Sequence, residues 1–171
     1  MLYKTLLGIV GGIVGLIVMI GVIGCFLPKQ RKARKVVEFE APVDTIWEVV
    51  SDMGRQAEWR PSVKRVEVQL NGDQLARWVE YPQSGLPIFF KMMLCQKPSL
   101  MEFEFTDQKV FKGYWAGEFQ SLPDRRTRLS ITETAEIAHT VMRVLSYLFF
   151  NMDRSIEEYL GEVRNRLGEK D

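Results

Sequence analysis

Hydrophobic and polar residues follow three different patterns along this chain, and each pattern predicts a different kind of element. Residues 6–27 are apolar or small, and no charged side chain interrupts them. As a helix this stretch is about 33 Å long, which is enough to cross a hydrocarbon core of roughly 30 Å. Pro28 follows and is expected to end the helix. The pattern therefore predicts an N-terminal transmembrane anchor over residues 1–28.

Two short helices are predicted after a first strand. The stretch RKVVEFEAP, residues 34–42, has the composition of a strand. Five apolar residues then recur at helical spacing; they are Val43, Ile46, Trp47, Val50 and Met53. The next stretch, GRQAEWRP at residues 54–61, predicts a second helix. That helix is too short to be stable unless it packs on another element.

Three consecutive hairpins are predicted next, because the hydrophobic period changes to two. The paired strands are residues 63–70 with 74–81, 86–96 with 100–107, and 112–122 with 127–137. Asn71-Gly72, between the first two strands, is typical of a hairpin turn. The alternation is clearest where Met101, Phe103 and Phe105 alternate with glutamates. The pattern predicts an antiparallel sheet with one apolar face and one face exposed to water.

The last predicted element is one long amphipathic helix from Thr140 to Leu167. Its apolar stripe has spacings of three and four and consists of Val141, Leu145, Leu148, Met152, Ile156, Tyr159, Val163 and Leu167. In the first half of the helix, the apolar surface widens to include Met142, Phe149 and Phe150. Burial of apolar area stabilises by about 25 cal/mol per Å², so this helix is expected to cover the apolar face of the sheet.

Three sequence blocks resemble the START/Bet v 1-like superfamily, also called SRPBCC or polyketide cyclase/dehydrase-like. Ala41-Pro42 begins a helix that contains a tryptophan, Trp59-Arg60-Pro61 precedes the next strand, and TRLSITETAEI forms the last strand. The resemblance covers residues 35–167 and implies an α+β helix-grip fold. In that fold a curved seven-stranded antiparallel sheet wraps around a long C-terminal helix, with a cavity between them. The domain is expected to occupy residues 36–171.

Charge divides the chain into a basic neck at residues 29–35 and an acidic domain. The neck contains Lys29, Arg31, Lys32, Arg34 and Lys35. Beyond it lie 17 basic and all 22 acidic residues, a net charge of −5 for the domain. The positive-inside rule predicts that the domain is cytoplasmic, and the neck is expected to contact anionic membrane lipids. The acidic balance argues against a nucleic-acid partner.

The cysteine at position 25 leaves an alternative to the anchor. The sequence VIGC, residues 22–25, resembles a bacterial lipobox, in which the cysteine is acylated after cleavage. In that interpretation the chain is a lipoprotein acylated at Cys25. The apolar run continues past Cys25, however, and a basic cluster that hinders export follows it. Both features favour the transmembrane anchor.

Small residues in the anchor leave its oligomeric state open. Gly8 and Gly12, and also Gly11 and Gly15, are four residues apart. This spacing lets two membrane helices approach closely and is compatible with a homodimer. Glycine is also common in membrane helices that do not pair.

Bulky residues of the predicted apolar faces are candidates for a ligand-binding cavity. They are Trp59, Met101, Phe103, Phe105, Trp115, Phe119, Leu148 and Met152. The same side chains could instead fill the interior. The ligand-binding interpretation is supported by composition, because surfaces rich in methionine and aromatic residues are typical of apolar ligand sites.

Strand parity predicts that two charged residues face the interior. Glu133 alternates in step with Leu129 and Ile131, and Arg77 in step with Val79 and Tyr81. A buried carboxylate or guanidinium is costly alone, so Glu133 and Arg77 are expected to pair or to bind a polar group of a ligand. The hydroxyl of Tyr81 is a further candidate. Alternatively, both charged residues lie near wet strand ends, or a bulge reverses the parity.

The sequence contains no pattern typical of a metal site, a cofactor site or a catalytic triad. There is one histidine, His139, and one cysteine outside the anchor, Cys95. A zinc site needs more ligands of these kinds, and no nucleophile, base and orienting group can be assigned together. No cofactor or metal is therefore expected.

These observations favour a membrane-anchored binding or carrier module for an apolar small molecule. A lipid, an isoprenoid, a quinone or a polyketide-like compound would suit the predicted cavity. One alternative is a structural or interaction module with a filled core. Another is a cyclase or dehydratase, implied by the family resemblance, that uses the glutamate, arginine and tyrosine residues of the pocket.

Overall fold

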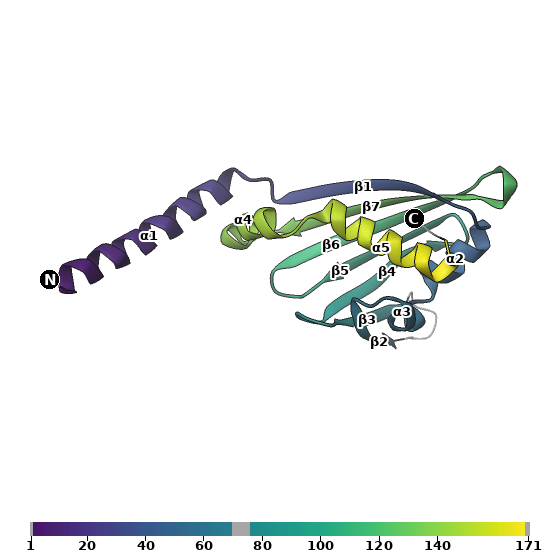
Figure 1. Ribbon diagram of the computed structural model, residues 1–171, viewed down its shortest axis with the longest axis horizontal. Coiled ribbons are helices and arrows are strands. Elements are labelled where there is room, and N and C mark those ends of the chain that lie inside the picture. The colour runs from purple at the N-terminus through teal and green to yellow at the C-terminus, as the bar shows by residue number, and fades with distance from the viewer. Residues whose placement is uncertain (1, 70–75, 170–171) are drawn as a thin grey trace.

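The N-terminal helix projects from a curved sheet that carries the other helices on one face (Figure 1). The computed structural model describes residues 2–69 and 76–169. Helix α1 (Leu2–Phe26) is long and apolar enough to cross a membrane from Leu7 to Phe26. It ends two residues before Pro28, as expected for a proline, which cannot continue a helix.

Seven strands form one antiparallel sheet, which confirms the predicted fold class. The order is β1-β7-β6-β5-β4-β3-β2, and every neighbouring pair is antiparallel. The predicted Asn71-Gly72 turn between β2 and β3 lies outside the described residues. The strands are β1 (Gln30–Phe39), β2 (Val63–Gln69), β3 (Arg77–Pro82), β4 (Ile88–Gln96), β5 (Leu100–Thr106), β6 (Phe111–Ser121) and β7 (Thr127–Ile137).

Strand β1 begins at Gln30, so residues 30–35 of the predicted neck are part of the sheet. All ten residues of β1 pair with β7, from Gln30 opposite Glu136 to Phe39 opposite Thr127. Arg31 and Lys35 lie on the same face of β1 as Ala33 and Val37. These charged residues conceal the alternation of apolar and polar positions that would have indicated a strand. The structure therefore leaves only Leu27, Pro28 and Lys29 between the helix and the sheet.

Three short elements follow β1 and cover one end of the sheet. They are α2 (Val43–Ser51), the 3₁₀ turn η1 (Met53–Arg55) and α3 (Gln56–Trp59), which agrees with the two predicted short helices. Helix α2 buries Ile46, Trp47 and Val50. The ring of Trp47 packs edge-on against Phe119 of β6, with ring centroids 5.0 Å apart. A further 3₁₀ turn, η2 (Pro123–Arg125), joins β6 to β7.

The prediction of one helix from Thr140 to Leu167 is wrong. The structure has two, α4 (Thr140–Phe149) and α5 (Met152–Leu167). The backbone is extended at Phe150 and at Asn151, with φ, ψ of −120°, 115° and −102°, 107°. The Asn151 side chain accepts a hydrogen bond from the backbone amide of Arg154, which caps the N-terminus of α5.

Helix α5 crosses the inner face of the sheet and completes the core (Figure 1). It buries Met152, Ile156, Leu160 and Val163. Its apolar stripe packs in one cluster with fully buried residues of the sheet, including Phe39, Met101, Leu129 and Ile131. Burying a side chain of this size stabilises the fold by about 1.5–3 kcal/mol. The sheet, with α5 docked on its inner face, is the expected helix-grip.

Candidate functional site: a cavity lined by aromatic residues

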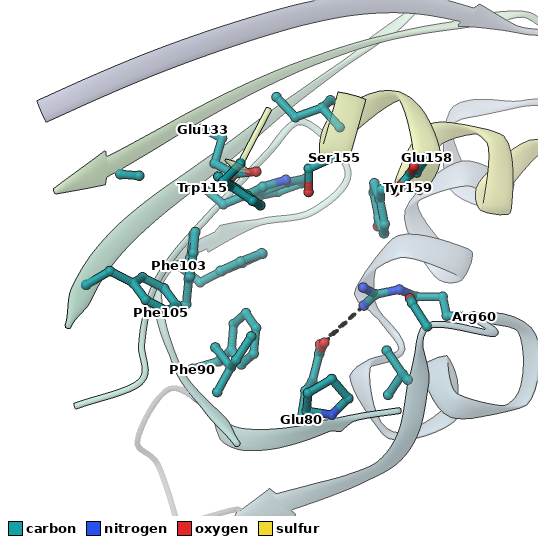
Figure 2. Close-up of a pocket in the computed structure, with 18 of the residues that line it drawn as sticks. Arg60, Glu80, Phe90, Phe103, Phe105, Trp115, Glu133, Ser155, Glu158 and Tyr159 are labelled. Atoms are coloured by element: carbon teal, nitrogen blue, oxygen red, sulfur yellow. Dashed lines mark hydrogen bonds and ion pairs between the residues drawn. The ribbon is translucent and has the colours of Figure 1, made fainter. Parts of the chain in front are cut away.

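A cavity of about 680 Å³ lies between the inner face of the sheet and helices α4 and α5. Pockets for small molecules typically have volumes of about 300–1,000 Å³. Five aromatic residues from four neighbouring strands form much of its wall; they are Trp78, Phe90, Phe103, Phe105 and Trp115. Figure 2 labels Phe90, Phe103, Phe105 and Trp115. Part of the interior is thus open, and the bulky side chains of the sheet do not fill it.

The aromatic residues of the wall form stacked pairs across neighbouring strands. Trp78 stacks on Phe90 with ring centroids 4.9 Å apart, and Phe103 stacks on Trp115 at 4.7 Å. Phe103 and Trp115 are direct partners in the β5–β6 register. Such pairs stabilise by about 0.5–1.5 kcal/mol beyond the area they bury. The wall is therefore a preformed apolar surface.

Two glycines in β6 allow the rings to lie flat on the sheet. Gly113 is opposite Phe105 in the register, and a Cβ atom there would overlap the Phe105 ring. A Cβ atom at Gly117 would overlap the ring of Trp115. Glycine in a strand often marks such a close approach.

Helices α4 and α5 form the opposite wall and part of the mouth of the cavity. Ile156 and Tyr159 contribute from α5, and Leu145, Phe149 and Phe150 from the α4 end. The Tyr159 ring is partly buried, and desolvation raises the pKa of its hydroxyl. The lining on this side is again mostly apolar.

Glu133 faces the cavity from β7, as its strand parity predicts. Its neighbours in the ladder are Ala33 of β1 and Trp115 of β6. Burial raises the pKa of its carboxyl to about 7, from an ordinary value of 4.5. Desolvation has this effect when no cation compensates it. Close to neutral pH, the carboxyl group therefore exchanges between a hydrogen-bond donor form and an acceptor-only form.

A second polar group, centred on Arg60, lies in another part of the cavity (Figure 2). The Arg60 guanidinium donates hydrogen bonds to Glu80 and Glu162, each at 3.2 Å, and to the side-chain oxygen of Gln56. The indole nitrogen of Trp78 also donates to Glu80, at 3.2 Å. The three charged side chains are less than one-fifth exposed. Their charges are largely satisfied within the protein.

Of the eleven predicted ligand-binding residues, four line the cavity: Phe103, Phe105, Trp115 and Glu133. Four others belong to the packed core. Met101 is fully buried, Phe119 contacts Trp47, and Met152 is buried at the start of α5. Trp59 packs near Tyr159, with ring centroids 6.4 Å apart. These residues shape the fold beneath or beside the cavity.

The remaining three lie outside the cavity, and the predicted inward orientation of Arg77 is wrong. Arg77 is exposed, and the residues of β3 that face the cavity are Trp78, Glu80 and Pro82. The Tyr81 hydroxyl donates to Glu67 at 3.0 Å, away from the cavity. Leu148 is 69% exposed on α4. The expected pairing of Glu133 with Arg77 therefore does not occur.

Sequence reasoning missed Arg60 and Glu80, which form the buried ion pair of the site. Arg60 follows α3 in an irregular segment, where parity carries no information. The inward orientation of Glu80 could have been predicted, because Glu80 lies two residues after Trp78 and therefore shares its face of β3. Both Trp78 and Val79 are buried, however, and so the apolar pattern of β3 does not distinguish its two faces.

Three of the five basic residues predicted to contact membrane lipids have partners in the protein. Arg31 donates to the backbone carbonyls of Ser146 and Phe150, at 3.0 and 3.2 Å. Lys35 bonds to Glu157 at 2.7 Å. Arg34 pairs with Glu118, whereas Lys29 and Lys32 are exposed. Among the described residues, no cluster of His, Cys, Asp and Glu has the arrangement of a metal site.

Comparison with known families and structures agrees with this architecture. Residues 30–149 match the family model described as polyketide cyclase / dehydrase and lipid transport. No curated protein sequence matches the chain.

Several solved structures share the fold at low sequence identity. An aromatase/cyclase from Streptomyces sp. R1128 is 18% identical, with a TM-score of 0.66 over 80% of this chain and 93% of its own. A START superfamily protein from Mycobacterium smegmatis is 17% identical, with a TM-score of 0.62 over 79% and 95%. Norcoclaurine synthase from Thalictrum flavum is 12% identical, with a TM-score of 0.65 over 83% and 96%.

Proposed function

Because this chain belongs to the polyketide cyclase/dehydrase and lipid transport family, we propose that it is a membrane-anchored binding or carrier protein for an apolar small molecule. The observation that carries the proposal is the cavity of about 680 Å³ with its aromatic wall. An apolar guest gains about 25 cal/mol for each Å² that it removes from water. The preformed wall adds affinity, because few side chains need to be ordered when the guest binds.

The polar residues of the cavity narrow the class of ligand. The Arg60–Glu80 pair is satisfied internally, whereas the Glu133 carboxyl has an apolar setting on β7. In its protonated form Glu133 can donate a hydrogen bond to a carbonyl or hydroxyl oxygen. The ligand is therefore a mostly apolar molecule with an oxygen function, such as a quinone or a polyketide-like compound, in preference to a pure hydrocarbon.

Helix α1 supplies the proposed anchor. It is long and apolar enough to span a bilayer, and by the positive-inside rule the basic residues that follow it support a cytoplasmic position for the domain. Apolar ligands of this class partition into membranes. The anchor therefore keeps the cavity close to the phase in which its ligand is most concentrated.

A cavity-filling substitution tests the binding proposal. Ala135 of β7 lines the cavity, and Ala135→Phe should occupy part of its volume. The matched control is Ala116→Phe on the neighbouring strand β6, because Ala116 does not line the cavity. We expect Ala135→Phe to weaken binding of an apolar fluorescent probe by about tenfold, or 1.4 kcal/mol, relative to the control.

The measurement uses the full chain in detergent and has two readouts. Titration with the probe gives its dissociation constant, and mass spectrometry of an organic extract identifies a co-purified ligand. Equal probe affinity in the two variants, together with an extract free of small molecules, would contradict the binding proposal.

Glu133 also supports a second candidate function, acid–base catalysis on the bound molecule. A group with a pKa of about 7 is well suited to donate and accept protons near neutral pH. Enzymes are present among the structural neighbours, including the aromatase/cyclase and norcoclaurine synthase. If the protein is a cyclase or dehydratase, Glu133→Gln should abolish turnover of its substrate while probe affinity is retained. Retained turnover would remove Glu133 from this role.

A further inference from the structure

Helix α4 is held against the end of α1 by a buried arginine. Arg143 of α4 is only 4% exposed. Its guanidinium donates to the carbonyls of Gly24 and Leu27 at the end of α1, at 2.8 and 3.2 Å. It also donates to the carbonyls of Ile137, the last residue of β7, and of Ala138, at 3.0 and 2.7 Å. One side chain thus joins the apolar helix, α4 and the last strand.

Close packing at Gly24 reinforces this attachment. A Cβ atom at Gly24 would lie 2.5 Å from Cγ2 of Thr140 and 2.6 Å from its carbonyl oxygen. At the other end of α4, the Arg31 guanidinium bonds to the carbonyls of Ser146 and Phe150 and lies over the Tyr147 ring. The position of α4 beside the last turn of α1 is therefore fixed at both of its ends (Figure 1).

Helix α4 and the residue that follows it expose a patch of large apolar side chains at the mouth of the cavity. We name this the α4 patch; it consists of Leu145, Leu148, Phe149 and Phe150. Phe149 is 82% exposed and Leu148 69%. At the end of α1, Phe26 is 86% exposed. Several large, strongly exposed apolar residues on neighbouring elements are characteristic of an interaction site.

The position of the patch indicates which partner covers it. If α1 spans a bilayer, its last turn lies at the boundary between acyl chains and headgroups, and α4 packs on that turn at Gly24. Helix α4 contains no acidic residue. The exposed Lys29 and Lys32 lie just after α1 and complement anionic headgroups. Exposed apolar side chains next to basic residues of a neighbouring segment are a favourable combination at an anionic membrane surface.

We propose that the α4 patch inserts into the membrane surface and that the cavity opens directly into the bilayer beside it. Leu145, Phe149 and Phe150 belong to the patch and also line the cavity. A ligand can therefore pass between the acyl chains and the aromatic wall along a continuous apolar surface. The inference rests on the proposed membrane anchoring and goes beyond it, because it assigns the entry route of the ligand to α4.

Nitroxide labels on single cysteines test the depth of the patch. The full chain, with Cys25→Ala and Cys95→Ser, carries Leu148→Cys, Phe149→Cys or Ile13→Cys in vesicles of phosphatidylcholine and phosphatidylglycerol. The matched control keeps the native Cys95, which is exposed near the β4–β5 turn, far along the sheet from α1. We expect collision with oxygen to exceed collision with a water-soluble nickel chelate at positions 148, 149 and 13, and the reverse at Cys95.

The label on Ile13 separates this inference from the proposed anchoring. If Ile13 lies in the bilayer and positions 148 and 149 are in water, α4 does not insert and the inference is overturned, while the anchor stands. If Ile13 is also in water, both the anchor and the inference are overturned.

Transfer kinetics test the entry route. Leu148 belongs to the patch but does not line the cavity. We expect Leu148→Ser to slow the transfer of a fluorescent fatty acid from vesicles to the protein severalfold, with its affinity in detergent unchanged. An unchanged transfer rate would overturn the entry route.

Discussion

Two of the four glutamates that line the cavity, Glu80 and Glu133, have opposite surroundings. Glu80 of β3 accepts hydrogen bonds from the Arg60 guanidinium and the Trp78 indole, both at 3.2 Å. Glu133 of β7 lies between Ala33 and Trp115 in the ladder, and burial alone dominates the pKa of its carboxyl. One carboxylate is thus part of a satisfied network, and the other is left available to a guest.

Within one cavity, the network around Glu80 therefore supports the fold, whereas Glu133 is a candidate functional residue. A buried ion pair positions α3 and α5 on the sheet, because Arg60 connects Glu80 of β3 with Glu162 of α5. A carboxyl group that is desolvated without a cation lowers stability when it is ionised. Residues that lower stability in an otherwise well-packed interior are candidates for function.

The largest expected effect comes from breaking the satisfied network. Arg60→Met leaves Glu80 and Glu162 without their cation, and removing one partner of a buried ion pair typically costs about 3–5 kcal/mol. Chemical denaturation of the full chain in detergent at neutral pH measures the loss. The matched control is Arg55→Met, because Arg55 pairs with Glu58 on an exposed surface. We expect the control to change the free energy of unfolding by less than about 1 kcal/mol; equal losses would contradict the structural role of Arg60.

The second prediction concerns pH and Glu133. Its pKa is about 7 in the folded protein and 4.5 ordinarily, so between these values the folded state binds more protons than the unfolded state. The free energy of unfolding should therefore fall as pH rises from about 4.5 to 7, by roughly 3 kcal/mol, and then level off.

Unfolding experiments across this pH range check the prediction. The variant Glu133→Gln has no group that titrates there, so the fall assigned to Glu133 should be absent from its profile. A wild-type profile identical to that of the variant would show that Glu133 is not desolvated in the way described.

The smallest expected effect concerns the Trp78 hydrogen bond. Trp78→Phe keeps an aromatic ring on Phe90 and removes the donor to Glu80. A hydrogen bond to a charged group contributes about 1.5–3 kcal/mol. Trp115→Phe is the control for the lost ring area, since the Trp115 ring lies beside Glu133 on the same wall. The stability difference between the two variants isolates the hydrogen bond, and we expect Trp78→Phe to be the less stable by about 1.5 kcal/mol.

Much of the fold was predictable because alternation is strong where one face of a strand is buried. Strands β5 and β7 show this alternation clearly, through Phe103 and Ile131 for example, and both hairpins at the described turns were expected. The break between α4 and α5 was missed because Phe150 extends the apolar stripe. Asn151 followed by Asp153 is a helix-start signal that could have located it.

The site was predictable only in part, because its polar groups depend on tertiary contacts. The inward orientation of Glu133 followed from its neighbours Leu129 and Ile131 on β7. The same reasoning failed for Arg77, since both faces of β3 contain buried residues. Arg60 and Arg143 act on partners far along the chain, Glu162 and Gly24 among them, and no local pattern indicates those contacts.

The glycines of β6 set the depth of the cavity from behind its aromatic wall. Gly113 and Gly117 leave room for the rings of Phe105 and Trp115 to rest on the backbone. A single methyl group at either position would push a ring toward the cavity and make it shallower. The depth of the cavity therefore depends on two positions that are absent from its lining, where a substitution would change the volume without altering any side chain of the cavity surface.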